Sequence, residues 1–217
     1  MKLFRLDASI RVEGSASRAL GDVVEAEWVK DDADATVIRR HVGTDPVPAT
    51  AWANAVAASG LAEEDRSPSH KAAAALAAAD VDALEQADAL LFAVPLYNFG
   101  VSQHFKSWVD LMITDPRMGP GGPSVLAGKP AVLATVLGGN YSAGTPREGW
   151  DHSTDWMRRV LADVWGLDLR IVKREFTLVG VNPALDQFTD MAKELHDSAE
   201  EQAREHGRFL ASGRVNA

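Results

Sequence analysis

Residues Ala89 to Gly100 read Ala-Leu-Leu-Phe-Ala-Val-Pro-Leu-Tyr-Asn-Phe-Gly. The continuous apolar run Ala89–Val94 is typical of a strand that is buried on both faces of a parallel sheet. Tyr97, Asn98 and Phe99 therefore follow the carboxyl end of this strand, where open α/β sheets bind their ligands. A plain turn is the alternative, in which Pro95 ends the strand and Asn98 caps the next helix.

The first loop of the chain is rich in hydroxyl groups. Ser9, Ser15 and Ser17 lie between the first predicted strand and the first predicted helix. The free N–H groups and the dipole at a helix N-terminus attract anions, and serine hydroxyls can donate to anion oxygens. The loop therefore predicts a site for a phosphate monoester, whereas helix capping alone would account for one serine better than for three. The glycine signatures of dinucleotide folds and P-loops are absent from this loop.

A third segment of interest follows the apolar strand that ends near Val136. Gly138 and Gly139 open a loop that continues through Asn140 and Tyr141. Paired glycines let the backbone approach a flat ligand closely and leave N–H groups free to bond its edge. A turn that needs positive φ would use the same glycines.

Apolar strands alternate with helical patterns along the whole chain, which predicts a parallel, doubly wound α/β sheet. Strands are predicted at Lys2–Ala8, Thr36–His41, Ala89–Val94, Ala131–Val136 and Leu169–Phe176. Helices are predicted at Ser17–Lys30, Pro68–Gln86, Val101–Ile113, Asp151–Trp165 and Ala184–Leu210. Residues 1–217 are expected to form a single domain, with an excursion at about residues 43–66 after the second strand.

Composition narrows the classes of function. A formal charge of −9 argues against nucleic acid or an anionic membrane surface as a partner, since both reward clustered Lys and Arg. The absence of cysteine excludes disulfides and thiol catalysis and fits a reducing compartment. No apolar run approaches the length that spans a bilayer, so we expect a cytoplasmic protein without a membrane partner.

The three strand ends resemble those of the flavodoxin-like, FMN-dependent NADH-azoreductases and the related NAD(P)H:quinone oxidoreductases. The resemblance implies a sheet order of 2-1-3-4-5. It also implies that the first loop holds the phosphate of FMN and that the Pro-Leu-Tyr-Asn-Phe stretch lines its isoalloxazine ring. The glycine pair would then bond the pyrimidine edge of the flavin. The implied cofactor-binding residues are Ser9, Arg11, Ser15, Ala16, Ser17, Pro95, Leu96, Tyr97, Asn98, Phe99, Gly138, Gly139 and Tyr141. Some members of the family have Ser-Arg before the glycines. Here Val136-Leu137 stands in that place, so a positive side chain is missing.

The resemblance implies an enzyme that carries FMN, takes hydride from NADH or NADPH, and reduces quinones, azo compounds or related aromatic acceptors. No side-chain acid or base is required, because the chemistry takes place on FMN. A homodimer is expected from the family. The alternatives are a flavodoxin-like electron carrier, a biosynthetic reductase with a dedicated substrate, and a regulatory domain without cofactor. Few cations are available for the 2′-phosphate of NADPH, and the nearest in sequence are Arg117, Lys129 and Arg147.

The sequence gives weaker support to a metal site, to serine hydrolysis and to a substrate-binding loop. His152 lies between Asp151 and Asp155, but no zinc-ligand spacing is present, and acidic residues in a first helical turn are explained by the helix dipole. The nucleophile elbow of a serine hydrolase is missing. Arg147 and Trp150 lie in a loop that could form a lid or a substrate wall, or could equally be a solvated arginine and a locally packed tryptophan.

Overall fold

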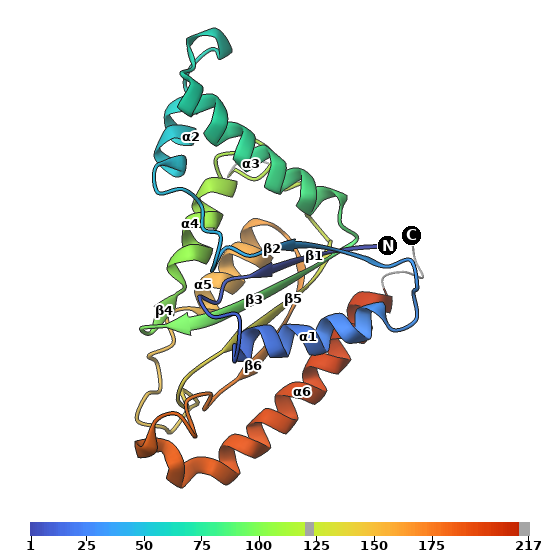
Figure 1. Cartoon of the computed structure of the whole chain (residues 1–217), viewed down its shortest axis with the longest axis vertical. Coiled ribbons are helices and arrows are strands. Elements are labelled where there is room, and N and C mark those ends of the chain that lie inside the picture. The colour runs from blue at the N-terminus through green and yellow to red at the C-terminus, as the bar shows by residue number, and fades with distance from the viewer. Residues whose placement is uncertain (120–123, 213–217) are drawn as a thin grey trace.

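The computed structural model has a central parallel sheet with helices on both faces (Figure 1). It describes residues 1–119 and 124–212. The sheet follows the order β2-β1-β3-β5-β6, and neighbouring strands on this path are parallel. Its strands are β1 (Lys2–Asp7), β2 (Thr36–Arg40), β3 (Ala89–Tyr97), β5 (Pro130–Val136) and β6 (Asp168–Arg174). The predicted order 2-1-3-4-5 is confirmed, because the additional short strand β4 lies outside this path.

The two faces of the sheet have separate apolar cores. One face is covered by α1 (Ala16–Val29) and α6 (Thr189–Ser212), which lie together in Figure 1 and bury Trp28 and Ala203 between them and the sheet. The opposite face is covered by α3 (Pro68–Gln86), α4 (Gln103–Met112) and α5 (Thr154–Arg158), and α2 (Ala51–Ser59) packs on α3 and α4. The predicted excursion at residues 43–66 contains α2 and a 3-10 turn at Glu63–Asp65.

Helix boundaries follow from local capping. Ser67 Oγ accepts from the N–H of His70 at 3.2 Å, and the His70 ring accepts from the N–H of Ser67 at 3.4 Å. This capping box begins α3 at the predicted residue. The helix predicted at Asp151–Trp165 begins later, at Thr154, because Asp151 Oδ1 accepts from the N–H groups of Ser153 and Thr154 at 3.0 Å each.

Two predicted helices are less regular than their patterns suggested. After α5 the chain continues as a π-helical turn over Arg159–Val164. The helix predicted to begin at Ala184 is a 3-10 turn over Pro183–Phe188 before α6 begins at Thr189. Asn182 starts that turn, since its side chain accepts from the N–H of Ala184 at 3.1 Å.

The end of β3 differs from the plain-turn alternative. The strand runs through Pro95 to Tyr97 and then folds back as β4 (Gly100–Val101), with Tyr97 paired to Gly100. Asn98 and Phe99 form the two-residue turn of this hairpin, with φ values of 48° and 67°. Such turns require positive φ at both central residues. Asn98 is therefore not a helix cap, and α4 begins only at Gln103.

Candidate functional site

A cavity of about 420 Å³ opens at the carboxyl ends of the central strands. Its volume lies within the range of small-molecule sites. It is lined by Ser9, Ile10, Arg11, Gly14, Ser15, Ala16, Ser17, Pro95, Leu96, Tyr97, Asn98, Phe99, Val136, Gly138, Tyr141, Arg147, Thr177, Leu178 and Val181. The structure thus brings together the residues that the sequence assigned to the cofactor, apart from Gly139, which does not line the cavity.

The first loop presents its serines at the start of α1. Ser15 is the N-cap, and its Oγ accepts from the N–H of Arg18 at 3.3 Å. The hydroxyl oxygens of Ser15 and Ser17 lie 3.3 Å apart, and both side chains are buried at the cavity wall. Capping therefore occupies Ser15 but leaves the buried hydroxyl of Ser17 facing its neighbour. Two adjacent hydroxyls at a helix N-terminus form a suitable cradle for phosphate oxygens.

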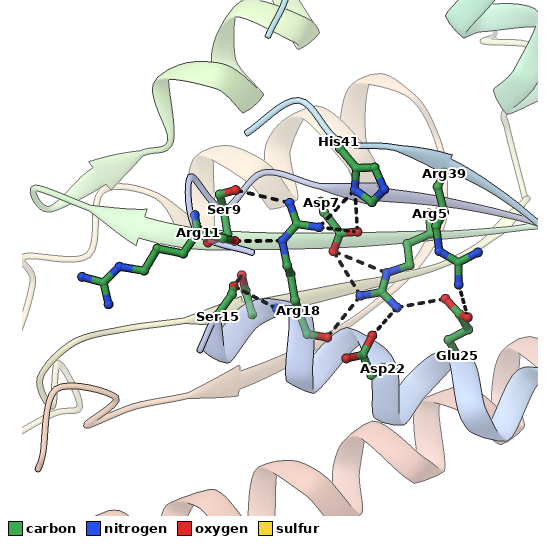
Figure 2. A network of polar contacts seen from close by, with 11 residues as sticks. Arg5, Asp7, Ser9, Arg11, Ser15, Arg18, Asp22, Glu25, Arg39 and His41 are labelled. Atoms are coloured by element: carbon green, nitrogen blue, oxygen red, sulfur yellow. Dashed lines mark hydrogen bonds and ion pairs between the residues drawn. The ribbon is translucent and has the colours of Figure 1, made fainter. Parts of the chain in front are cut away.

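Arg18 fixes the shape of this loop from the start of α1 (Figure 2). Its guanidinium donates to the backbone carbonyls of Arg11 at 2.9 Å and Ser9 at 3.4 Å. The same group pairs with the buried Asp7 carboxylate at 3.3 Å and lies 3.0 Å from the ring of His41. Asp7 is the last residue of β1, so one ion pair ties the loop to the end of the central strand. The loop is thereby preorganised for a ligand.

Arg5 holds the other side of the Asp7 carboxylate. It donates to Asp7 at 3.1 Å, to Asp22 at 2.6 Å and to Glu25 at 2.9 Å. Burial opposes the charge of this guanidinium, but the three carboxylates outweigh it and raise the pKa of Arg5. Figure 2 shows these charged side chains between β1 and α1. A buried arginine with satisfied partners gives α1 one orientation on β1.

The hairpin at the end of β3 forms a second wall. A phenylalanine at positive φ is uncommon, and a residue in the left-handed region stores about 1–3 kcal/mol of strain. Such strain is concentrated at functional sites. The hydroxyl of Tyr97 lies 3.4 Å from Ser9 Oγ and accepts from the N–H of Ile10 at 3.3 Å. Tyr97 thus joins the hairpin to the first loop, in addition to lining the cavity.

The glycine pair is crowded on both sides. A methyl group on Gly138 would lie 2.6 Å from Leu178, and one on Gly139 would lie 2.7 Å from Arg147. Gly138 O accepts from the N–H of Leu178 at 3.2 Å. Because C=O and N–H point in opposite directions in a trans peptide, the Gly139 N–H points away from Leu178. The glycines therefore permit close packing of the Leu178 and Arg147 side chains. Neither glycine has a positive φ, so the alternative of a turn that needs positive φ is wrong.

Sequence reasoning missed the wall that follows β6. Thr177, Leu178 and Val181 line the cavity, although nothing in their local pattern marks them as binding residues. Their position at the end of a parallel strand is the signal that could have found them, since these ends meet at one edge. The Thr177 hydroxyl donates to Leu137 O at 3.0 Å and fixes this segment beside the glycine loop.

The loops at residues 140–150 and 114–128 differ in their contribution to the cavity. The loop at residues 140–150 supplies Tyr141 and Arg147 to the cavity, and Trp150 packs edge-on against Phe99 with ring centroids 5.4 Å apart. Among the described residues of the loop at 114–128, none lines the cavity; residues 120–123 lie outside the described ranges.

Two of the three cations considered for NADPH lie elsewhere. Arg117 pairs with Asp115 at 2.9 Å and with Asp82 at 2.6 Å on the α3 side of the molecule. Lys129 donates to backbone carbonyls at the C-terminus of α3, including Ala87 O at 2.5 Å. Neither residue lines the cavity. Arg147 is the cation of the three that lines the cavity.

The remaining acid and histidine candidates have structural contacts. His152 is exposed and its N–H donates to Phe99 O at 3.0 Å, while Asp151 caps α5. Within the described ranges, no three His, Asp or Glu side chains gather as a metal site would require. No helix in the described part of the chain is long and apolar enough to cross a membrane.

The sequence of this chain is similar to sequences of known proteins. A model of the flavodoxin-like fold matches residues 1–204. An FMN-dependent NADH:quinone oxidoreductase of Frankia alni is 36% identical over 204 residues, which cover 93% of this chain and 96% of that protein. One of a Parafrankia species is 33% identical over 205 residues, which cover 94% and 97%. This chain belongs to the flavodoxin-like quinone oxidoreductase family.

Solved structures share the fold of this flavodoxin-like oxidoreductase. The azoreductase AzrA superimposes with a TM-score of 0.77 at 19% identity and covers 98% of this chain and 100% of its own. An FMN-dependent NADH-azoreductase from Bacillus anthracis, in complex with FMN, gives a TM-score of 0.74 at 16% identity, with 97% and 100% covered. At this level of identity the likeness concerns the architecture.

Proposed function

We propose that this flavodoxin-like protein is an FMN-dependent oxidoreductase that uses NADH to reduce quinones, azo compounds or related aromatic acceptors. The observation that carries the proposal is the pairing of two features in one cavity. Buried serines lie at the N-terminus of α1, and the strained Asn98–Phe99 turn lies on the neighbouring strand end. A phosphate monoester attached to a flat ring system has the shape and charge that both features require.

The residues of the first loop fit the FMN phosphate. Ser9, Ser15 and Ser17 are each less than a tenth exposed and line the cavity. The α1 dipole favours a dianion at this place, and Arg18 fixes the loop by donating to the carbonyls of Arg11 and Ser9. Binding is therefore electrostatic and directional at this end of the cavity.

The strand-end loops fit the ring system. The Asn98–Phe99 turn and the Gly138–Gly139 loop lie on the adjacent strands β3 and β5. When bound, FMN supplies the chemistry by accepting hydride at N5 and passing electrons to the acceptor. The chain positions the ring and donates N–H groups near its pyrimidine edge. The Phe99–Trp150 contact holds the β3 turn beside the loop at residues 140–150.

Steady-state kinetics test this function. No dinucleotide fingerprint accompanies the cavity, so donor and acceptor are expected to use one flavin face in turn. The purified chain with FMN should oxidise NADH with a quinone and no partner protein, and double-reciprocal plots at several acceptor concentrations should be parallel. NADH should be preferred over NADPH. Intersecting lines would contradict the shared-face model, and turnover only with a protein partner would indicate an electron carrier instead.

The assembly is proposed to be a homodimer. Large apolar side chains are exposed near the cavity and on α2, including Ile10, Phe99, Trp150 and Trp52 at 58%, 41%, 49% and 51% exposure. Exposed aromatic residues are enriched at subunit interfaces. Sedimentation of the FMN-bound protein at micromolar concentration should give twice the mass of the chain, and a monomer would contradict the assembly. We place the protein in the cytoplasm, where its proposed donor NADH is kept.

A further inference from the structure

Arg147 lies against the glycine loop although it is eight residues away in sequence from Gly139. A methyl group on Gly139 would come within 2.7 Å of Arg147 Nη1 and within 3.7 Å of its Cδ. The guanidinium lies 5.8 Å from the centre of the Tyr141 ring and donates to the Tyr141 hydroxyl at 3.5 Å. The side chain therefore folds back over the loop and lines the cavity beside Gly138.

This cation has no anionic partner in the described part of the chain. Other structured arginines, such as Arg5 and Arg117, pair with carboxylates at 2.6–3.1 Å, whereas the hydrogen bond of Arg147 is to a neutral phenol. The adjacent carboxylate of Glu148 is turned away and accepts from the N–H of Gly144 at 2.7 Å. A half-buried cation without a carboxylate is poorly compensated, and negative charge on a ligand would offset that cost.

The loop around Arg147 is held in place from below. The buried Glu175 carboxylate accepts from the N–H of Tyr141 at 2.9 Å and from the Ser142 hydroxyl at 2.8 Å. Trp150 N–H donates to Arg147 O at 3.1 Å. Because Tyr141 is fixed to the protein interior, the guanidinium that rests on it has a defined place at the β5 side of the cavity.

We propose that Arg147 supplies positive charge at the pyrimidine edge of FMN and makes reduction of the flavin more favourable. The inference rests on the proposed placement of FMN. Hydride transfer from nicotinamide to N5 delivers two electrons and one proton, releases NAD⁺, and leaves the flavin with an added negative charge over N1 and O2. Val136 and Leu137 carry no charge that could stabilise it. Arg147 performs this role from a later point in the chain, since it reaches the same glycines in space.

The test compares the reduction potential of bound FMN in Arg147→Gln, Arg147→Met and Arg147→Lys with that of the parent. Arg158→Gln is the matched control, because Arg158 is exposed and pairs with Asp163 at 3.6 Å away from the cavity. The neutral variants should bind reduced FMN about tenfold more weakly, relative to oxidised FMN, than the parent does. For a two-electron couple this corresponds to a potential lowered by about 30 mV. Lysine should restore part of the shift.

Each other outcome overturns the assignment. Unchanged potentials in both neutral variants would show that Arg147 does not act on the flavin. A lysine variant as low as the glutamine variant would show that charge is not the cause. A changed preference between NADH and NADPH with an unchanged potential would assign Arg147 to the dinucleotide. Failure of the parent chain to bind FMN would instead overturn the proposed function, so the two failures are distinguishable.

Discussion

Replacing both serines at the start of α1 tests how the cavity holds its ligand. The hydroxyls of Ser15 and Ser17 lie 3.3 Å apart and are almost fully buried, so both can reach oxygens of one phosphate. In the double variant Ser15→Ala, Ser17→Ala, FMN loses these donors. A hydrogen bond to a charged group contributes about 1.5–3 kcal/mol. Without ligand the two hydroxyls bond to each other, so we count the net loss of one bond, which weakens FMN binding about tenfold to 100-fold.

The effect on folding must be separated from the effect on binding. Ser15 also caps α1 by accepting from the N–H of Arg18, whereas Ser17 caps nothing. Ser15→Ala should therefore lower the free energy of unfolding of the apoprotein by about 1 kcal/mol. Ser17→Ala should leave stability nearly unchanged and weaken FMN binding. Ser59→Ala on the exposed end of α2 is the matched control for both measurements.

The assay is titration of the apoprotein with FMN and, in parallel, with riboflavin, followed by quenching of flavin fluorescence. Riboflavin lacks the phosphate, so its affinity should be the same in the parent and in the double variant. The reasoning is refuted if FMN affinity is unchanged in the double variant. It is equally refuted if riboflavin affinity falls by the same factor, because the loss would then not concern the phosphate.

Two further predictions concern stability. Gly43→Ala places a methyl group 2.0 Å from the backbone oxygen of Ser9, so it should lower the free energy of unfolding by about 1–3 kcal/mol and weaken FMN binding. The control is Gly60→Ala, whose added methyl group has no atom within 4 Å and should leave the chemical denaturation curve nearly unchanged. Equal effects of the two substitutions would contradict the first prediction. Burial lowers the pKa of His206 below its usual 6.5, while the ring contacts Ile171 O at 3.4 Å. As the pH falls, the unfolded chain therefore binds a proton on this histidine before the folded chain does. The free energy of unfolding should decrease as the pH falls through and below about 6.5, and the decrease should be smaller in His206→Gln, as measured by denaturation at several pH values. The same pH dependence in both proteins would contradict this prediction.

The sequence alone determined the order of strands and helices, because that information is local. The apolar run Ala89–Val94 is typical of a strand buried on both faces, and Ser67-Pro68 is typical of a helix start. The serines of the first loop and the glycine pair were identified for the same reason. Their residue types suit an anion and a flat ligand whatever surrounds them.

The tertiary structure alone decided how those parts meet. The hairpin turn that holds Asn98 and Phe99 at positive φ depends on the pairing of β3 with β4. The hydrophobic periodicity of the sequence does not predict this pairing. Leu178 covers Gly138 from the segment after β6, and Arg147 reaches Gly139 across a loop. Such contacts are set by packing between segments distant in sequence. The periodicity of a sequence predicts the local secondary structure of each segment. It therefore cannot show that a cation lies beside a glycine several residues away.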